Sequence, residues 1–289
     1  MMEETTGLLL EGGAMRSVFS AGILDCLMDE QIQIPNVLAV SAGAYAGMNY
    51  VSGQRKRVID AVIAPLREYK YLGFGTFLKK GTFFDMDYLF KEVPKTRSPY
   101  DFDKMKNYVG RFLTSTVNLL TGETVYFEKF KDVDEFFTIC QAANSLPLIA
   151  KKTMIDGVPM LDGGAVDAIP IHKALEDGWG KIVVVLTRDI TYRKKASGKL
   201  YNKILDLVYG KYPEFVKRTQ MRHCTYNNAL DQLAELESQG RAFVFRPTTL
   251  TVSSHECDVE KLMEYYQHGY DTATARMDEL KHFLGICKI

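Results

Sequence analysis

The sequence predicts an α/β fold with a mostly parallel central sheet, and two patterns carry that prediction. Short continuous apolar runs, typical of strands buried on both faces of a parallel sheet, occur at residues 7–10, 37–40, 182–186 and 242–245. Between the first two runs, apolar residues recur at helical spacing over residues 17–31. Strand, helix and strand therefore form a βαβ unit, whose crossover we expect to be right-handed.

The remaining elements extend the same sheet. Residues 112–119 and 123–130 predict a hairpin around Thr121-Gly122, and Asp156-Gly157 suits the type I′ turn of a second hairpin. Helical patterns cover residues 201–236 and 258–283. Both ends of the chain supply strands, so we expect one continuous sheet and a single domain over residues 1–289. Residues 1–190 would form the core that holds every motif described below, and the mainly helical residues 191–289 would complete or cover that core.

Composition excludes several classes of protein. The 289 residues include 36 basic and 36 acidic side chains, which lack the basic excess of a dedicated nucleic-acid binder. No apolar run approaches the ~18 residues of a membrane helix, and the acidic start does not resemble a secretory signal. Five cysteines without a C-x-x-C pair fit reduced thiols, so we expect a cytoplasmic protein. Peripheral contact with a membrane surface is compatible with this composition, and the oligomeric state is left open.

The first motif is the glycine-rich segment Leu-Leu-Leu-Glu-Gly-Gly-Ala-Met-Arg-Ser at residues 8–17, where a strand ends and a helix begins. Glycines let the backbone approach a ligand, and a helix N-terminus offers N–H groups to a phosphate or a reaction oxyanion. A P-loop would need Gly-Lys-Ser/Thr, which is absent. A dinucleotide fingerprint would need glycines where Ala14 and Ser17 stand, and an acidic residue near 33–36. An ordinary βα turn is the alternative.

The second motif is the sequence Val-Leu-Ala-Val-Ser-Ala-Gly-Ala at residues 37–44. A strand, a serine and small residues that open a helix are the layout of a nucleophile elbow, normally G-x-S-x-G. Ser41 would be the nucleophile, and Ala39 stands where the first glycine is usual. The alternative is a serine that only caps the helix.

The third motif places Asp162 in Asp162-Gly163-Gly164, in the loop after the second hairpin. This sequence also suits a simple turn. A nucleophilic serine needs a base, normally histidine. No histidine lies in a glycine-rich loop or beside an identifiable strand end; the five are His172, His223, His255, His268 and His282. Asp162 is therefore the best-placed base if Ser41 is a nucleophile.

Taken together, these segments resemble the patatin-like phospholipase family of lipid acyl hydrolases. That family has a G-G-G-x-R/K-G motif, a G-x-S-x-G elbow and a D-G-G/A motif. The corresponding segments here are Gly12-Gly13-Ala14-Met15-Arg16-Ser17, Ala39-Val40-Ser41-Ala42-Gly43 and Asp162-Gly163-Gly164, with further similarity at residues 142–147 and 166–170. The resemblance covers roughly residues 7–190, and the order and spacing of the motifs make it more specific than any motif alone.

The resemblance implies a three-layer α/β/α sandwich and a serine hydrolase of the phospholipase A or esterase type that acts on lipid or other esters. Ser41 and Asp162 would form a catalytic dyad without histidine, and the reaction would pass through an acyl-enzyme. The N–H groups of Gly12, Gly13 and Ala14 would form the oxyanion hole. Arg16 would support that loop or meet an anionic head group, with a bracing salt bridge as the alternative. No cofactor and no metal are expected.

Three departures from the family pattern bear on activity: Ala14, Ser17 and Ala39 each replace a glycine. Ala14 matters most, because a residue with a Cβ atom resists a positive φ. A less well-formed oxyanion hole would lower the rate. One alternative is therefore a lipid-binding or regulatory protein with a weak dyad. A second alternative, from another class, is a nucleotide-dependent oxidoreductase that uses the glycine loop.

Two further segments bear on substrate choice. Residues 69–102 are rich in aromatic residues and lysines, which suits a lid or interfacial patch or, alternatively, rings packed in the core. Residues 188–222 contain ten basic and three acidic side chains, so this segment could attract anionic lipid. A solvated helix face is the alternative for the basic segment.

Overall fold

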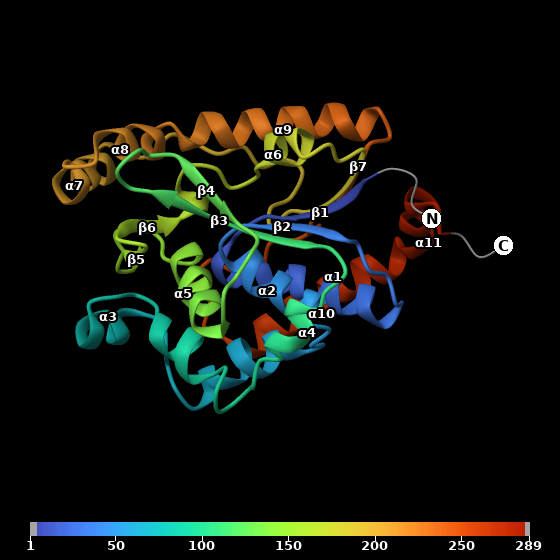
Figure 1. Ribbon diagram of the computed structural model, residues 1–289, viewed down its shortest axis with the longest axis horizontal. Helices are drawn as coiled ribbons and strands as arrows, with labels where there is room; N and C mark the ends of the chain where they lie inside the picture. Colours follow the sequence, from blue (N-terminus) through green and yellow to red (C-terminus); the bar gives the residue numbers. More distant parts are fainter. Residues whose placement is uncertain (1–4, 287–289) are drawn as a thin grey trace.

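One sheet of eight strands organises the computed structural model, which describes residues 5–286 (Figure 1). The strands are β1 (Thr6–Leu10), β2 (Asn36–Ala39), β3 (Arg111–Asn118), β4 (Thr124–Phe127), β5 (Thr153–Ile155), β6 (Val158–Asp162), β7 (Lys181–Val185) and β8 (Ala242–Phe245). Their order is β5-β6-β3-β2-β1-β7-β8, and β4 also pairs with β3. The run from β3 to β8 is parallel, whereas β4, β5 and β6 pair antiparallel.

Helices cover both faces of this sheet, so the expected three-layer α/β/α arrangement is confirmed (Figure 1). They are α1 (Val18–Asp29), α2 (Ala42–Val51), α3 (Phe74–Lys80), α4 (Phe102–Lys106), α5 (Val133–Ala143), α6 (Ile171–Glu176), α7 (Lys199–Tyr209), α8 (Pro213–Gln220), α9 (Arg222–Ser238), α10 (Val259–Ala275) and α11 (Met277–Leu284). Short 3-10 turns are η1 (Ala14–Ser17), η3 (Ala64–Arg67) and η5 (Gly163–Ala165), and π-helical turns are η2 (Ile59–Ile63) and η4 (Tyr88–Glu92).

The alternation of side chains along the strands separates two cores. Leu8, Leu10 and Val37 belong to the larger core, with α1, α2, α5 and α10. Leu9 and Leu38 face the other way and pack with α6 and α9. Strands buried on both faces must be apolar at every position, which explains the continuous runs in the sequence.

The two predicted hairpins are present. β3 and β4 pair antiparallel, and Gly122 between them has a φ of +71°. The second hairpin joins β5 to β6 through Asp156 and Gly157, with φ values of +48° and +76°. Positive φ at both central residues is the type I′ geometry that Asp-Gly favours.

The structure corrects two expectations in detail. The helical run predicted at residues 201–236 is three helices, α7, α8 and α9, because Pro213 starts a new helix and Tyr212 before it leaves the helical region. Asp162 is the last residue of β6 and accepts the capping N–H of the following turn. The prediction that Asp162 lies in the loop after the second hairpin is therefore wrong, because Asp162 still belongs to strand β6.

Helix α10 lies directly against α1, the helix that follows the glycine-rich loop. A Cβ atom on Gly22 would lie 2.0 Å from the Tyr266 carbonyl oxygen, and one on Gly269 would lie 2.1 Å from that of Phe19. Glycine at both positions is required for this close approach. The C-terminal region therefore packs against the helix that leads out of the glycine-rich loop.

No helix within residues 5–286 is long and apolar enough to cross a membrane. The four cysteines in that part of the chain are unpaired thiols, and Cys287 lies outside the described residues.

Candidate active site

Ser41 occupies a strained turn between β2 and α2. Its φ of +56° and ψ of −132° are unfavourable for a residue with a Cβ atom, and such strain is characteristic of functional positions. The Ser41 side chain makes no capping hydrogen bond to α2. The capping interpretation is therefore wrong, and the geometry is that of a nucleophile elbow.

Small residues around Ser41 are needed for different reasons. A Cβ atom on Gly43 would lie 2.7 Å from the Glu11 carbonyl oxygen, because the backbone after β1 crosses the start of α2. Ala39 instead belongs to β2 and is fully buried, paired with Leu10 on one side and Thr114 on the other. Ala39 has no positive φ, so alanine replaces the usual first glycine of the elbow without backbone strain.

The glycine-rich loop faces the same turn. A Cβ atom on Gly12 would lie 2.5 Å from the Ser41 Cβ, and one on Gly13 would lie 2.7 Å from Thr187 Oγ1. The N–H groups of Gly12 and Gly13 have no acceptor within residues 5–286. Ala14 begins η1, so its N–H has no partner inside that turn. Three backbone donors are therefore free beside Ser41.

Ala14 has a φ of +49°. The strain expected from a Cβ atom at this position of the loop is thus present in the structure. Ser17, another replacement of a family glycine, is buried with its hydroxyl unpartnered and has an ordinary φ of −70°.

Asp162 is fully buried at the end of β6, opposite Thr116 of β3. Its Oδ1 accepts the Gly164 N–H at 2.8 Å, and its Oδ2 has no hydrogen-bond partner within residues 5–286. Burial raises the pKa of Asp162 to about 6, although the Ser41 hydroxyl, the Gly164 N–H and the charge of Arg222 all favour the ionised form. A carboxylate with a free oxygen and a pKa near neutrality is suited to accept a proton.

Glu11, which the sequence motifs did not identify as functional, holds the glycine-rich loop in place. Its buried carboxylate accepts hydrogen bonds from the Thr187 N–H at 2.6 Å and hydroxyl at 3.0 Å, and from the Tyr226 hydroxyl at 2.7 Å. These bonds connect the end of β1 to the end of β7 and to α9. The glycine-rich loop is therefore fixed to both neighbouring elements before any ligand binds.

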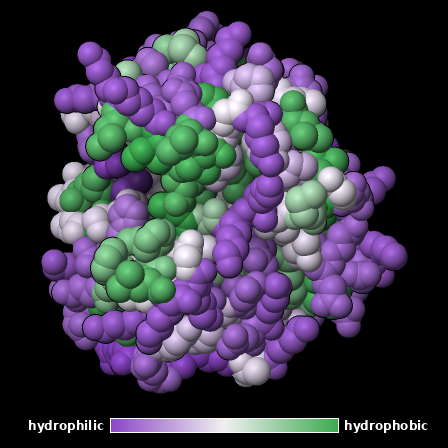
Figure 2. Space-filling view, turned by 90° about the vertical axis from the view of Figure 1, so that its left-hand side faces the viewer, coloured by the Kyte–Doolittle hydropathy of each residue, from purple (hydrophilic) through white to green (hydrophobic). Residues whose placement is uncertain are grey.

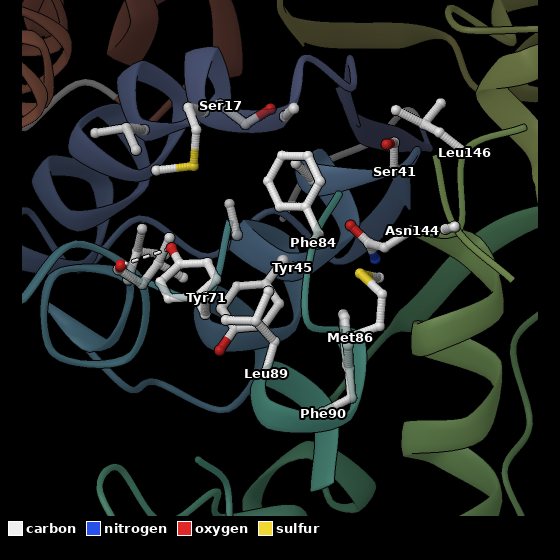
Figure 3. Close-up of a pocket in the computed structure, with 18 of the residues that line it drawn as sticks. Ser17, Ser41, Tyr45, Tyr71, Phe84, Met86, Leu89, Phe90, Asn144 and Leu146 are labelled. Atoms are coloured by element: carbon white, nitrogen blue, oxygen red, sulfur yellow. Dashed lines mark hydrogen bonds between the residues drawn. The ribbon is translucent and has the colours of Figure 1, made fainter. Parts of the chain in front are cut away.

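An apolar cavity opens from Ser41 toward the helices below the sheet (Figure 3). It has an empty volume of about 710 Å³. Ser41 lies at one end of it, near Leu146 and Asn144, whereas Tyr45 and Tyr71 line the part farther away (Figure 3). A narrow apolar space beside a polar group is the usual form of a site for an acyl chain.

A second, polar cavity of about 790 Å³ adjoins Ser41 on the other side. It contains Asp162, the glycine-rich loop and four cationic side chains, which are Arg16, Arg188, Lys194 and Arg222. Ala14, Ser41, Phe84 and Leu146 line both cavities. Ser41 is thus at the junction of an apolar and a cationic space.

One histidine that the sequence spacing did not place near the site lies close to it. His255 lines the polar cavity, in the loop that follows β8. Its Nδ1 contacts the Ser254 hydroxyl at 3.0 Å, and burial lowers its pKa. His255 makes no hydrogen bond to Ser41 or Asp162 within the described chain. Sequence spacing gave no sign of its position, because loop 246–258 reaches the site only through the tertiary fold.

The two segments thought to bear on substrate choice each divide between two roles. In residues 69–102, Tyr71 and Phe90 are buried and line the apolar cavity, whereas Phe74 and Leu78 are exposed. In residues 188–222, Arg188, Lys194 and Arg222 line the polar cavity, whereas the other basic side chains of the segment, such as Arg193, do not. Arg16 has no carboxylate within 4.0 Å in the described part of the chain, so no bracing salt bridge is present there.

Comparisons with known proteins agree with this geometry. The family model described as patatin-like phospholipase matches residues 8–175, and a domain of unknown function (DUF6363) matches residues 212–285. The uncharacterized protein YjjU of Escherichia coli is 25% identical over 185 residues, which are 62% of this chain. The aligned part is 51% of that relative, so the chain spans about half the length of the curated protein it matches.

The fold is also similar to a solved structure. VipD from Legionella pneumophila superposes with a TM-score of 0.52 over 96% of this chain and 67% of its own, at 11% sequence identity. The likeness to VipD shows the fold. Because the patatin-like family model matches more than half of the residues, from β1 to α6, this chain belongs to the patatin-like phospholipase family.

Proposed function

We propose that this chain is a serine lipid acyl hydrolase of the phospholipase A or esterase type, with Ser41 as nucleophile and Asp162 as base. The observation that carries the proposal is the convergence of three features on one point. Ser41 stands on a strained turn, beside free backbone N–H groups and a buried carboxylate with an unused oxygen. Structural serines do not need this combination.

The reaction follows from these positions. Asp162 accepts the Ser41 hydroxyl proton as Oγ attacks the ester carbonyl carbon. The N–H groups of Gly12, Gly13 and Ala14 hold the resulting oxyanion, an effect worth about 3 kcal/mol per donor. The tetrahedral intermediate collapses, and the alcohol leaves with the proton from Asp162. Asp162 then accepts a proton from water as the water attacks the acyl-enzyme carbonyl. The bond between the acyl carbon and Ser41 Oγ breaks, Asp162 returns the proton to Oγ, and the carboxylic acid is released.

The cavities support a lipid substrate. The apolar cavity begins at Ser41 and is lined by aliphatic and aromatic side chains, so an acyl chain bonded to the reacting carbonyl would be buried there. The same arrangement disfavours a nucleotide-dependent oxidoreductase. Ser41 occupies the space beside Gly12 that a side chain would otherwise fill, so this space is not available to a pyrophosphate.

We also propose that the face around α3 and α7 contacts an anionic membrane surface. Leu200, Ile204 and Leu207 form an exposed stripe on α7, and Leu207 is 85% exposed. Phe74, 69% exposed, lies on α3. Both helices lie at the same end of the molecule, and Figure 2 shows hydrophobic clusters on that end, separated by polar residues.

The charges beside these apolar residues support anionic lipid as the partner. Exposed lysines lie on the same helices as these apolar residues, namely Lys79 on α3 and Lys199 and Lys203 on α7. Each basic residue near an anionic membrane contributes about 1 kcal/mol. Leu207→Ser should weaken sedimentation with phosphatidylglycerol-containing vesicles, whereas Val109→Ser, equally exposed and just before β3, should not. Equal sedimentation of both variants and the wild type would overturn the membrane contact.

The catalytic proposal is tested on p-nitrophenyl esters of increasing chain length. Ser41→Ala and Asp162→Ala should each lower kcat by at least about 100-fold. Wild-type rates in either variant would exclude the dyad. An inactive wild-type protein that still binds lipid would favour the lipid-binding alternative.

A further inference from the structure

The polar cavity beside Ser41 holds more positive charge than its own residues neutralise. Four cationic side chains line it, against the carboxylates of Glu11 and Asp162. Glu11 already accepts three hydrogen bonds from Thr187 and Tyr226. The cations therefore face the cavity without a matching number of available anions.

None of these four cations has a carboxylate within 4.0 Å in residues 5–286, although other arginines of the chain do. Arg193 pairs with Asp231 at 2.9 Å and Arg246 with Glu237 at 2.6 Å. By contrast, the Nε atoms of Arg16 and Arg222 are buried without a hydrogen-bond partner. Burying a guanidinium nitrogen without a hydrogen-bond partner costs free energy, and a bound anion would supply the missing partner.

The excess of positive charge also affects Lys194. Burial, followed by the charges of Arg222, Arg188 and Arg16, lowers the pKa of Lys194 to about 8, with Glu11 acting in the opposite direction. Like charges in one cavity repel one another, and an anion bound between them would offset that repulsion.

These side chains are held in place before any ligand binds. The Arg188 guanidinium lies over the Tyr192 ring at 4.4 Å. Asn227 of α9 fixes the Lys194 backbone from both sides, accepting its N–H at 2.9 Å and donating to its carbonyl at 3.0 Å. The Lys194 Nζ lies 5.5 Å from the Tyr226 ring. Preorganised cations bind an anion at lower entropic cost.

We propose that Arg188, Lys194 and Arg222 form an anion subsite that binds a phosphate group on the alcohol side of the ester, so that the enzyme selects phosphate-bearing lipids. This inference rests on the proposed hydrolase function. Guanidinium groups match the geometry of phosphate oxygens, and a lysine adds a compact charge. Because Ser41 joins the two cavities, the acyl chain would enter one and the phosphate the other.

The subsite also gives the C-terminal region a role. Arg188 and Lys194 lie beyond residues 8–175, and Arg222 belongs to the segment matched as a domain of unknown function. Tyr226, Ser254 and His255 from that segment line the same cavity. The C-terminal region would thus determine which head group reaches Ser41.

The test compares two esters that differ only in the phosphate, 1-octanoylglycerol 3-phosphate and 1-octanoylglycerol. In the wild type, kcat/KM should be higher for the phosphate ester. Lys194→Gln should lower the ratio of the two kcat/KM values about tenfold, since it removes one charged hydrogen bond. Lys195→Gln removes the same charge from an exposed neighbour outside the cavity and should leave the ratio unchanged. Equal ratios in the wild type and in both variants would overturn the subsite.

A binding measurement separates this proposal from the hydrolase proposal. Isothermal titration of Ser41→Ala with glycerol 3-phosphate should show binding that Lys194→Gln weakens about tenfold. If the wild type hydrolyses neither ester but this binding is found, the hydrolase proposal fails and the subsite stands. Inorganic phosphate that binds as tightly as glycerol 3-phosphate would overturn the head-group assignment, and absence of binding would overturn the subsite itself.

Discussion

Gly12 lies directly against Ser41: a Cβ atom at Gly12 would come within 2.5 Å of the Ser41 Cβ and 3.3 Å of its Oγ. The glycine-rich loop and the nucleophile elbow, 29 residues apart in the chain, are thus complementary surfaces in the structure. Two parallel neighbouring strands, β1 and β2, bring them together, because both strands end at the same edge of the sheet.

Gly12→Ala should therefore inactivate the enzyme. The added methyl group meets the Ser41 Cβ and the Val40 carbonyl, neither of which is the end of a flexible side chain, so the loop or the elbow must move. We expect kcat/KM on p-nitrophenyl butyrate to fall at least about 100-fold, the effect of losing one oxyanion donor. Gly157→Ala is the control for a glycine change as such: a Cβ there meets nothing within 4 Å, although its φ is positive. Gly12→Ala protein with wild-type activity would contradict the described contact.

Ala14 should respond oppositely to smaller and larger replacements. Because its φ is +49°, Ala14→Gly relieves backbone strain and should keep or raise kcat. Ala14→Val should lower kcat, because a β-branched residue at positive φ is a marked outlier. Steady-state rates of the two variants measure this. Faster turnover by the valine variant than by the glycine variant would show that the loop conformation is not the one described.

The pKa of Asp162, raised to about 6 by burial, predicts a dependence of both rate and stability on pH. The base must be ionised, so kcat/KM should fall as pH decreases through about 6. In the folded protein the carboxyl holds its proton more tightly than in the unfolded chain. The free energy of unfolding should therefore decrease as pH rises from about 4 to about 6.

Asp162→Asn removes this buried charge and should stabilise the protein at pH 7 while it abolishes activity. A shift of about two pKa units corresponds to about 3 kcal/mol. The gain should be full above about pH 6 and disappear below about pH 4, where the wild-type carboxyl is neutral as well. Urea unfolding of both proteins across this range measures it. A destabilised Asn variant at pH 7 would mean that the ionised carboxylate is held by favourable contacts instead.

Tyr226→Phe tests the anchor of the loop. It leaves Glu11 Oε1 without the hydroxyl that now donates at 2.7 Å, so the free energy of unfolding should decrease by about 1.5–3 kcal/mol. Tyr265→Phe is the matched control, since the buried Tyr265 hydroxyl has no hydrogen-bond partner in the described chain. Thermal or urea unfolding compares the two variants. Equal effects would show that the bond to Glu11 does not stabilise the fold.

Much of the fold could be predicted because it depends on local sequence. Buried parallel strands must be apolar on both faces, and Asp156-Gly157 has few conformations other than a type I′ turn. The strand β8 has the predicted bounds, 242–245. Pro213 indicates that a helix begins within residues 201–236, but the apolar periodicity continues across it, so the sequence predicted one helical run instead of three helices.

The polar cavity could not be predicted in the same way. Lys194 and Arg222 come from different elements and approach Ser41 only through tertiary packing, so their spacing in sequence has no periodic meaning. His255 reaches the cavity from a loop without regular structure. Glu11 is adjacent to the glycine motif, but its role depends on Thr187 and Tyr226, which are more than 170 residues away.

Reaction of the protein with a fluorophosphonate, followed by peptide mapping, tests the roles of Ser41 and Asp162 most directly. Only an activated serine reacts quickly, and the phosphonyl oxygen occupies the position of the oxyanion. We expect a single adduct on Ser41, its absence in Ser41→Ala, and a labelling rate at least about 100-fold lower in Asp162→Asn. An adduct on another serine, or equally fast labelling of Asp162→Asn, would show that Ser41 and Asp162 do not act as a dyad.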